Sequence, residues 1–143
     1  MRDLHNNIDV KRGLSPKAAV TDNTAYVSQI VDTLGYDSCE FVILLGANTD
    51  SDATFAVLFE DGNEANLSDH AAVDDDYLLG TEALAGFTAA DDDNKVKKIG
   101  YVGLKRYCRV TITPSGNDSG NHFVAGLWIL GHPHSAPTAN PPA

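Results

Sequence analysis

The strongest constraint on the fold is a two-residue alternation of apolar and polar side chains in short segments between turn-rich links. Cys108, Val110 and Ile112 alternate with polar residues, and three large apolar residues alternate in the same way over 55–59. This period places the apolar side chains on one face of a β-strand. No helical segments alternate with these strands. The sequence therefore predicts an all-β fold, an antiparallel β-sandwich or barrel that is jelly-roll-like in form.

Further β-type segments cover 25–32, 39–45, 99–103 and 123–130, and residues 60–63 read as a hairpin-type turn. Residues 77–84 fit either a short helix or an irregular strand. Cys39 and Cys108 fall on core-facing positions, so we expect them to be reduced neighbours in the core. Trp128 lies in a strand that is apolar on both faces, which favours burial of its ring in the core.

The two ends of the chain differ from the middle and predict three parts. Residues 1–23 mix charge, Asn and a Ser-Pro pair, which is typical of an extended N-terminal arm. Residues 24–131 carry the β pattern and form a single β domain. Residues 132–143 hold four of the six prolines, so they predict an extended C-terminal tail outside the sheets.

The charges are segregated along the chain. From Ala18 to Asn94 there is no Lys or Arg, but there are seventeen of the twenty Asp and Glu residues. Such polarity favours docking in a fixed orientation. A net charge of −10 argues against nucleic-acid binding and against an anionic membrane surface. No apolar run approaches the roughly 20 residues that span a bilayer, so we expect no membrane partner.

Two patterns resemble metal sites. His132 and His134 flank Pro133, and a cupin-like enzyme could use this pair together with His122. No carboxylate follows the pair, and proline disturbs the strand that would align it. The triplets 74–76 and 91–93 are all aspartate, but neither has the spacing of a calcium-binding loop. We therefore expect no metal and no cofactor, while loose cation binding by the acidic loops stays open.

Four stretches together resemble small structural proteins encoded in the head-gene clusters of tailed bacteriophages. They are Asp3 to Ile8 (DLHNNI), Gly35 to Phe41 (GYDSCEF), Lys98 to Tyr107 (KIGYVGLKRY) and Leu130 to His134 (LGHPH). The resemblance runs along nearly the whole chain. It implies a non-enzymatic capsid decoration or cement protein that binds the outer capsid surface and stabilises contacts between major capsid protein subunits. It also implies a virion location, after assembly in the host cytoplasm.

The expected partners are the major capsid protein and copies of the chain itself, for which a trimer suits the local axes of a shell. Multivalent attachment would then raise the avidity of weak single contacts. The residues expected to contact the capsid come from the N-terminal arm and from the second basic stretch. They are Leu4, His5, Ile8, Lys11, Arg12, Lys97, Lys98, Lys105 and Arg106.

Three alternatives remain at this point. A head–tail joint component would belong to the same structural class but occupy another place in the virion. A small cupin-like metal-binding protein would use the three histidines. A carbohydrate-binding module on the virion would stack sugars on Trp128 or Tyr36.

Overall fold

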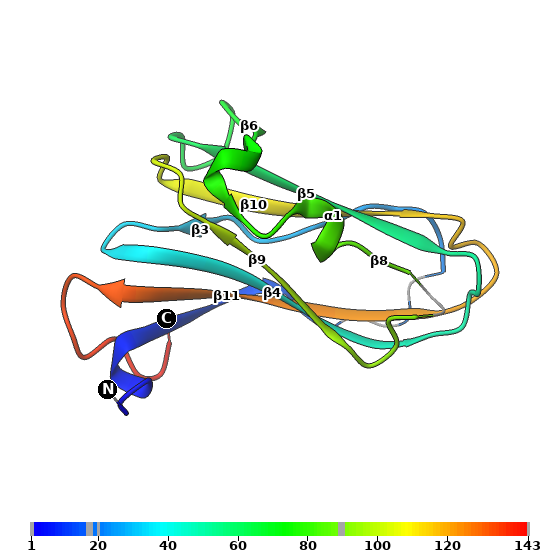
Figure 1. The fold of residues 1–143 in the computed structure, drawn as a ribbon, viewed down its shortest axis with the longest axis horizontal. Coiled ribbons are helices and arrows are strands. Elements are labelled where there is room, and N and C mark those ends of the chain that lie inside the picture. The colour runs from blue at the N-terminus through cyan, green and yellow to red at the C-terminus, as the bar shows by residue number, and fades with distance from the viewer. Residues whose placement is uncertain (1, 17–18, 20, 89–90, 143) are drawn as a thin grey trace.

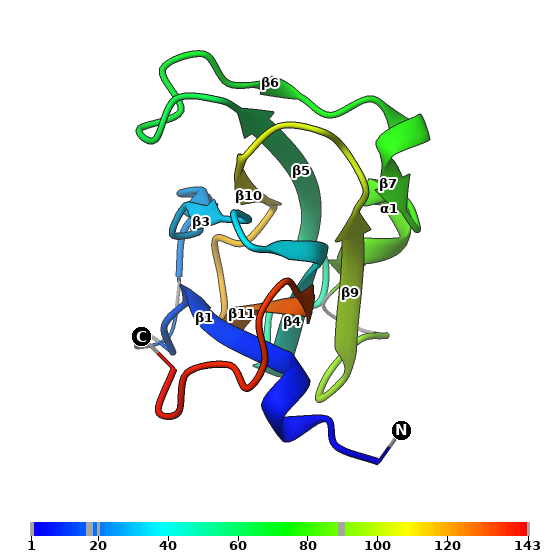
Figure 2. The ribbon, with the colours of Figure 1, turned by 90° about the vertical axis from the view of Figure 1, so that its left-hand side faces the viewer.

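The computed structural model describes residues 2–16, 19, 21–88 and 91–142 and shows two antiparallel sheets packed face to face (Figure 1). The first sheet has the strand order β1-β11-β4-β9-β7. The second has the order β2-β10-β5-β6, with β3 also paired to β10 and β8 to β5. In Figure 2 the segment that contains β6 passes above β5 and β10. The predicted all-β class is confirmed, in the form of a sandwich.

The elements follow one another along the chain with these bounds. The longer strands are β1 (Ile8–Leu14), β4 (Tyr36–Asn48), β5 (Thr54–Gly62), β9 (Val96–Tyr101), β10 (Tyr107–Ser115) and β11 (His122–Pro133). The two-residue strands are β2 (Tyr26–Val27), β3 (Val31–Asp32), β6 (Ala71–Ala72), β7 (Leu78–Leu79) and β8 (Phe87–Thr88). The helical turns are η1 (His5–Asn7), η2 (Asp75–Tyr77) and α1 (Glu82–Ala85).

The core lies between the sheets and is built from the inward residues of the alternating strands. Trp128 is fully buried, with its ring 4.6 Å from that of Phe41 and 5.7 Å from that of Phe59. Its Nε1 donates a hydrogen bond to the Gln29 carbonyl at 3.1 Å. Since the indole is enclosed on every side, the proposed stacking of sugars on Trp128 is wrong.

The two cysteines are neighbours in this core, as predicted. Cys39 and Cys108 are both buried and both free thiols. The hydrogen bond with Cys39, together with burial, raises the pKa of the Cys108 thiol well above its usual range. Because the thiolate is the nucleophilic form, this setting opposes cysteine reactivity and fits a packing role.

The N-terminal segment differs from the expected arm. Residues 8–14 form β1, which pairs with β11 from Ile8 opposite Gly131 to Leu14 opposite Gly126. Asp9 and Leu14 are buried. The prediction of an arm outside the β domain is wrong for these residues, because an extended chain beside the open edge of β11 satisfies its backbone hydrogen bonds there.

The C-terminal segment also folds onto the sandwich. β11 continues through His132 to Pro133, and the His134 amide donates to the Gly35 carbonyl at 2.8 Å. Thr138 donates from its amide to the Asn6 carbonyl at 3.1 Å and from Oγ1 to the Ile8 carbonyl at 2.6 Å. The C-terminal segment therefore holds η1 and the start of β1 in place.

Residues 77–84, for which the sequence allowed either a short helix or an irregular strand, lie in an irregular segment. Residues 75–85 contain η2, β7 and α1 in turn, so both a short helix and a short strand occur. Glu82, at the start of α1, accepts a hydrogen bond from the Phe59 amide of β5 at 2.6 Å. The expected turn at 60–63 begins later, because β5 continues to Gly62 opposite Tyr107. No helix among the described residues is long and apolar enough to cross a membrane.

Candidate functional site

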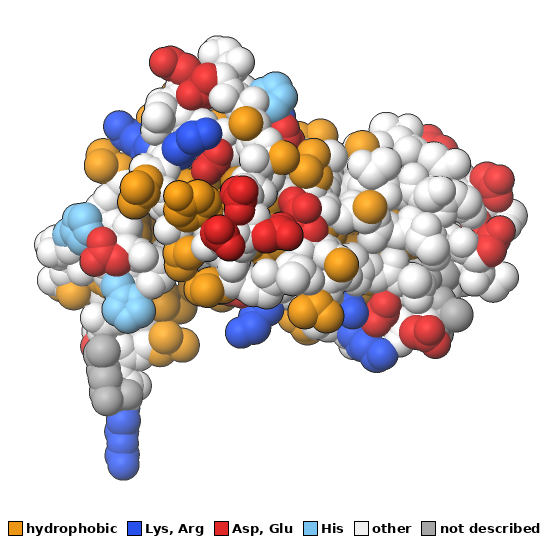
Figure 3. All heavy atoms as spheres, turned by 45° about the horizontal axis from the view of Figure 1, so that its top comes forward, with side chains coloured by type: hydrophobic (Ala, Val, Ile, Leu, Met, Phe, Trp, Pro, Cys, Tyr) orange, Lys and Arg blue, Asp and Glu red, His pale blue; other side chains and the backbone are white. Residues whose placement is uncertain are grey.

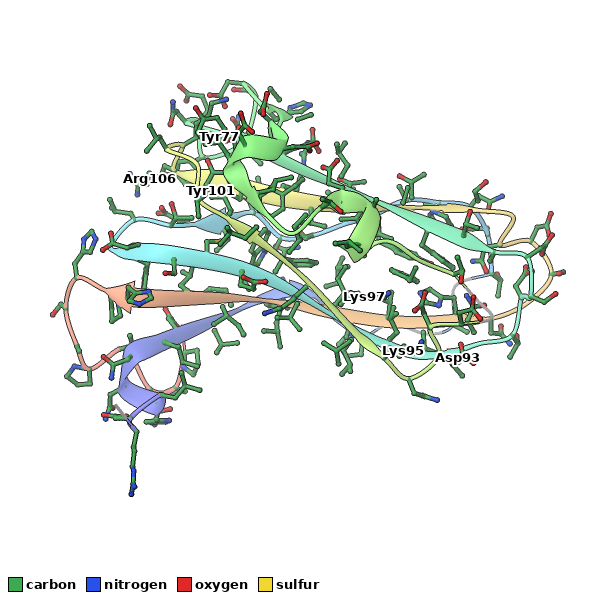
Figure 4. The ribbon with its side chains drawn as sticks, in the orientation of Figure 1. Tyr77, Asp93, Lys95, Lys97, Tyr101 and Arg106 are labelled. Carbon is green, nitrogen blue, oxygen red and sulfur yellow. The ribbon has the colours of Figure 1, made fainter. Side chains whose placement is uncertain are left out.

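Four of the basic residues expected to contact a capsid already pair with carboxylates of the same chain. Acidic side chains are spread over the face seen in Figure 3, while Lys and Arg occur there in a few small groups. In Figure 4, Lys95 and Lys97 lie at one end of β9, and Tyr101 and Arg106 lie toward the other. The pairs are Lys11–Asp9 at 2.9 Å, Lys97–Asp92 at 3.1 Å, Lys105–Asp61 at 3.0 Å and Arg106–Asp32 at 2.8 Å.

These pairs fix loops and strand edges to the sandwich. Asp61 is mostly buried and accepts from the Tyr101 hydroxyl at 2.7 Å as well as pairing with Lys105. Arg106 donates two hydrogen bonds to Asp32, and these bonds lower the pKa of that carboxyl against the effect of burial. Lys105 and Arg106 therefore have structural partners, and their contact with a capsid stays a prediction.

The outer face of the five-stranded sheet carries aliphatic side chains on all five of its strands. The register aligns them in three rows. The rows are Val10–Ile129–Glu40–Gly100–Leu79, then Arg12–Leu127–Val42–Lys98, then Ala125–Leu44–Val96. Leu44, Leu79 and Val96 are each more than half exposed. Exposed apolar residues gathered on one face are typical of interaction surfaces, so this face is the candidate site.

Arg12 and Lys98 stand at opposite sides of the middle row, and both are exposed. Within the described part of the chain, no carboxylate lies within ion-pair distance of either side chain. Arg12 donates to the Ser15 hydroxyl at 3.0 Å. Unlike Lys97, Lys105 and Arg106, these two cations remain available to an acidic partner at the border of the apolar face.

A hollow of about 440 Å³ opens at one end of this face. The N-terminal segment forms one wall. Strand β7 and the residues that follow β9 form the other wall. Leu4, Ile8 and Ile129 line it on the first side, and Leu79 and Val102 on the second. Two residues that the sequence singled out, Leu4 and Ile8, therefore meet here. His5 lies outside the lining, in η1, where its carbonyl accepts from Thr138 Oγ1 at 3.5 Å.

Glu40 is the residue of this site that sequence reasoning missed. It lines the hollow from β4, on the outward side, and is half-buried. Burial raises the pKa of its carboxyl, and the charge of Lys98 opposes that shift. Its position inside the otherwise apolar run 39–45 was the available signal, since an acid in such a run must reach solvent or a partner.

The three histidines do not form a metal site. His122 begins β11, whereas His132 and His134 lie at and beyond its other end, roughly 30 Å away at the rise of a β-strand. His122 is 1% exposed, and its ring lies 4.3 Å from that of Phe55. His134 pairs with Asp37 at 2.7 Å. The cupin-like use of all three histidines is therefore wrong.

The acidic triplets cap turns and brace strands. Asp74 accepts from the Asp76 amide at 3.0 Å, and Asp93 accepts from the Asn48 amide at 2.9 Å. Asp92 accepts from the Thr88 amide and pairs with Lys95 and Lys97. Over the described ranges, no group of three His, Cys, Asp or Glu side chains is placed to hold a metal ion.

No protein family model matches this chain, and no curated protein matches it by sequence. Its fold is similar to that of PBSX exported protein XepA, with a TM-score of 0.54 and 14% identity, over 98% of this chain and 42% of that chain. It is equally similar to a chain in the acidic stable capsid structure of Helicobacter pylori bacteriophage KHP30. There the TM-score is 0.54 and the identity 11%, over 93% of each chain. This chain thus spans less than half of the XepA chain, and both likenesses show the fold.

Proposed function

We propose that this chain is a non-enzymatic virion structural protein that binds the outer surface of a phage capsid and stabilises contacts between major capsid protein subunits. The observation that carries the proposal is the apolar outer face of the five-stranded sheet, bordered by Arg12 and Lys98. Burial of that face against a shell would remove aliphatic surface from water. The two cations would orient the docking on acidic capsid side chains.

The similarity in fold to a chain of the KHP30 capsid structure supports this proposal, and so does the resemblance of four sequence stretches to phage head proteins. The attachment of the N-terminal segment to the C-terminal one also supports it. β1 is clamped by Thr138, so the N-terminal segment presents Leu4 and Ile8 as part of a preformed surface. A preformed surface loses less conformational entropy on binding than a free arm does.

The test is reconstitution of the purified protein on phage shells that lack it. We expect bound copies in numbers comparable with the major capsid protein, counted by mass spectrometry of intact particles. A low copy number confined to one vertex would instead support the head–tail joint alternative. No binding to shells, with self-association through the same face, would overturn the proposal.

A matched pair of double variants tests the face itself. Arg12→Gln with Lys98→Gln and Thr111→Glu with Ser115→Glu change the net charge equally, but the second pair lies on the other sheet. We expect the first to lower the association rate with shells about tenfold at low salt and the second to leave it nearly unchanged. Equal effects would mean that net charge, and not this face, controls docking.

A further inference from the structure

Glu40 projects its carboxylate over the backbone of the neighbouring strand. A side chain at Gly100 would place a Cβ atom 2.7 Å from Glu40 Oε2 and 3.0 Å from Leu79 Cβ. The carboxylate therefore occupies the space that a side chain would fill in the row Glu40–Gly100–Leu79. The glycine allows the acid to lie flat on the sheet at the lining of the hollow.

This carboxylate has no partner in the described part of the chain. No hydrogen-bond donor and no Lys, Arg or His nitrogen is within bonding distance of it, and Lys98 acts on it only at longer range. A carboxylate that is partly withdrawn from water and unpaired is unfavourable, and it lowers its free energy by gaining a cationic partner. The other acids that border the hollow differ, because Asp3 accepts from Asn6 and Asp37 pairs with His134.

The lining around Glu40 is mainly apolar, although Arg2, Asn7, Ser38 and His132 also line the hollow. Leu4 and Ile8 face Leu79 and Val102 across the hollow, and its volume of about 440 Å³ lies in the range of sites that enclose a ligand group. Lys and Arg side chains combine a long apolar stem with a terminal cation. A mainly apolar hollow with one unpaired carboxylate matches that combination, whereas a purely apolar side chain would leave the acid half-buried and unpaired.

We propose that the hollow is a socket for one Lys or Arg side chain of the major capsid protein, with the stem against the aliphatic walls and the cation on Glu40. This inference rests on the proposed function and adds the partner's chemistry to it. It also gives the docking face two complementary kinds of contact. Arg12 and Lys98 meet acids of the shell, and Glu40 receives a base, so the contact has a defined register.

The experiment measures binding of the full chain to shells for the wild type and three variants. Glu40→Gln keeps the shape and removes the charge, and Glu40→Lys reverses the charge. Glu64→Lys is the matched control at an exposed acid that does not line the hollow. We expect about tenfold weaker binding for Glu40→Gln, about a hundredfold or more for Glu40→Lys, and wild-type binding for Glu64→Lys.

Thermal unfolding of the free proteins separates a binding role from a structural one. Since the Glu40 charge is unpaired in the free chain, Glu40→Gln should melt at or above the wild-type temperature while it binds more weakly. A lower melting temperature together with weaker binding of Glu40→Gln would overturn the socket proposal. So would wild-type binding by both Glu40 variants, although the proposed function would then stand. Failure of the wild type to bind shells would overturn both.

Discussion

The outer faces of the two sheets have the same antiparallel geometry but differ in how their charges are paired and in how many aliphatic residues they expose. The five-stranded sheet presents aliphatic residues with unpaired charges at Arg12, Glu40 and Lys98. The other sheet presents hydroxyl-bearing residues such as Thr111 and Thr113, together with the exposed Val27 and Leu58 on either side of Thr111. Its charges are paired, with Arg109 on Glu60 at 3.1 Å and His70 on the same acid at 3.4 Å.

This difference indicates which outer face is already satisfied by solvent and by its own ion pairs in the isolated chain. Paired charges and hydroxyl groups satisfy one another or water, so the second sheet gains less from a partner than the first does. Aliphatic rows and an unpaired half-buried carboxylate gain free energy when a partner covers them. The molecule is thus two-sided, with one face suited to water and one suited to a protein surface.

The largest expected effect comes from His122, which joins the two sheets. It belongs to β11, and its ring lies among those of Phe55, Phe87 and Tyr26. Burial lowers the pKa of His122 from 6.5 to about 4, against a small opposing effect of Asp93. Burial also raises the pKa of the Tyr26 hydroxyl to about 12, so it stays neutral in this range.

Because unfolded His122 binds a proton below about pH 6.5 and the folded one only near 4, stability should fall as pH falls through this window. The expected loss is about 3 kcal/mol. Urea unfolding of the wild type and His122→Phe at pH 7, 5.5 and 4 measures it. The variant should lose less stability over this range. An identical slope in both proteins would contradict the assignment.

A smaller effect is expected when the paired charges are broken. Lys105→Met leaves the mostly buried Asp61 with only the Tyr101 hydroxyl, which should lower the free energy of unfolding by about 2 kcal/mol. Arg106→Met breaks a pair whose side chains are both over 40% exposed, so it should cost less than about 1 kcal/mol. Urea unfolding compares the two. A larger loss for Arg106→Met would contradict this view of the pairs.

A change of binding and not of stability tests the comparison between the faces directly. Leu127→Asp places a charge in the middle row of the five-stranded sheet, and Thr113→Asp places one on the other sheet. Both sites are at the surface, so both proteins should fold. Shell binding should weaken about tenfold, or about 1.4 kcal/mol, for Leu127→Asp only. Equal weakening by the two variants would remove the distinction between the faces.

Much of the fold was predictable because strand periodicity is a local property. The alternation at 108–113 and 55–59 and the apolar run that contains Trp128 identified strands and core residues correctly. Leu4 and Ile8, which the sequence predicted as capsid contacts, line the hollow, but no sequence pattern predicted the hollow itself. Glu40 was missed because its run was read as one apolar segment.

Other features depended on contacts between residues distant in the sequence. Arg106 and Asp32 are 74 positions apart, so nothing local indicates that this cation is already paired. β1 likewise has a mixed composition that is typical of an extended arm. Only its pairing with β11, which is distant in the sequence, makes it a strand of the sheet. Such pairings are decided by tertiary geometry.

The sequence alone determined the all-β class, the core cysteines and tryptophan, and the segregation of charge, because period and composition act locally. Only the tertiary structure decided which aliphatic residues face outward. A strand with apolar side chains on both faces has the same sequence pattern whether its second face is buried or exposed to solvent. In this sandwich the second sheet covers one face of the five-stranded sheet and leaves the face around Leu127 exposed.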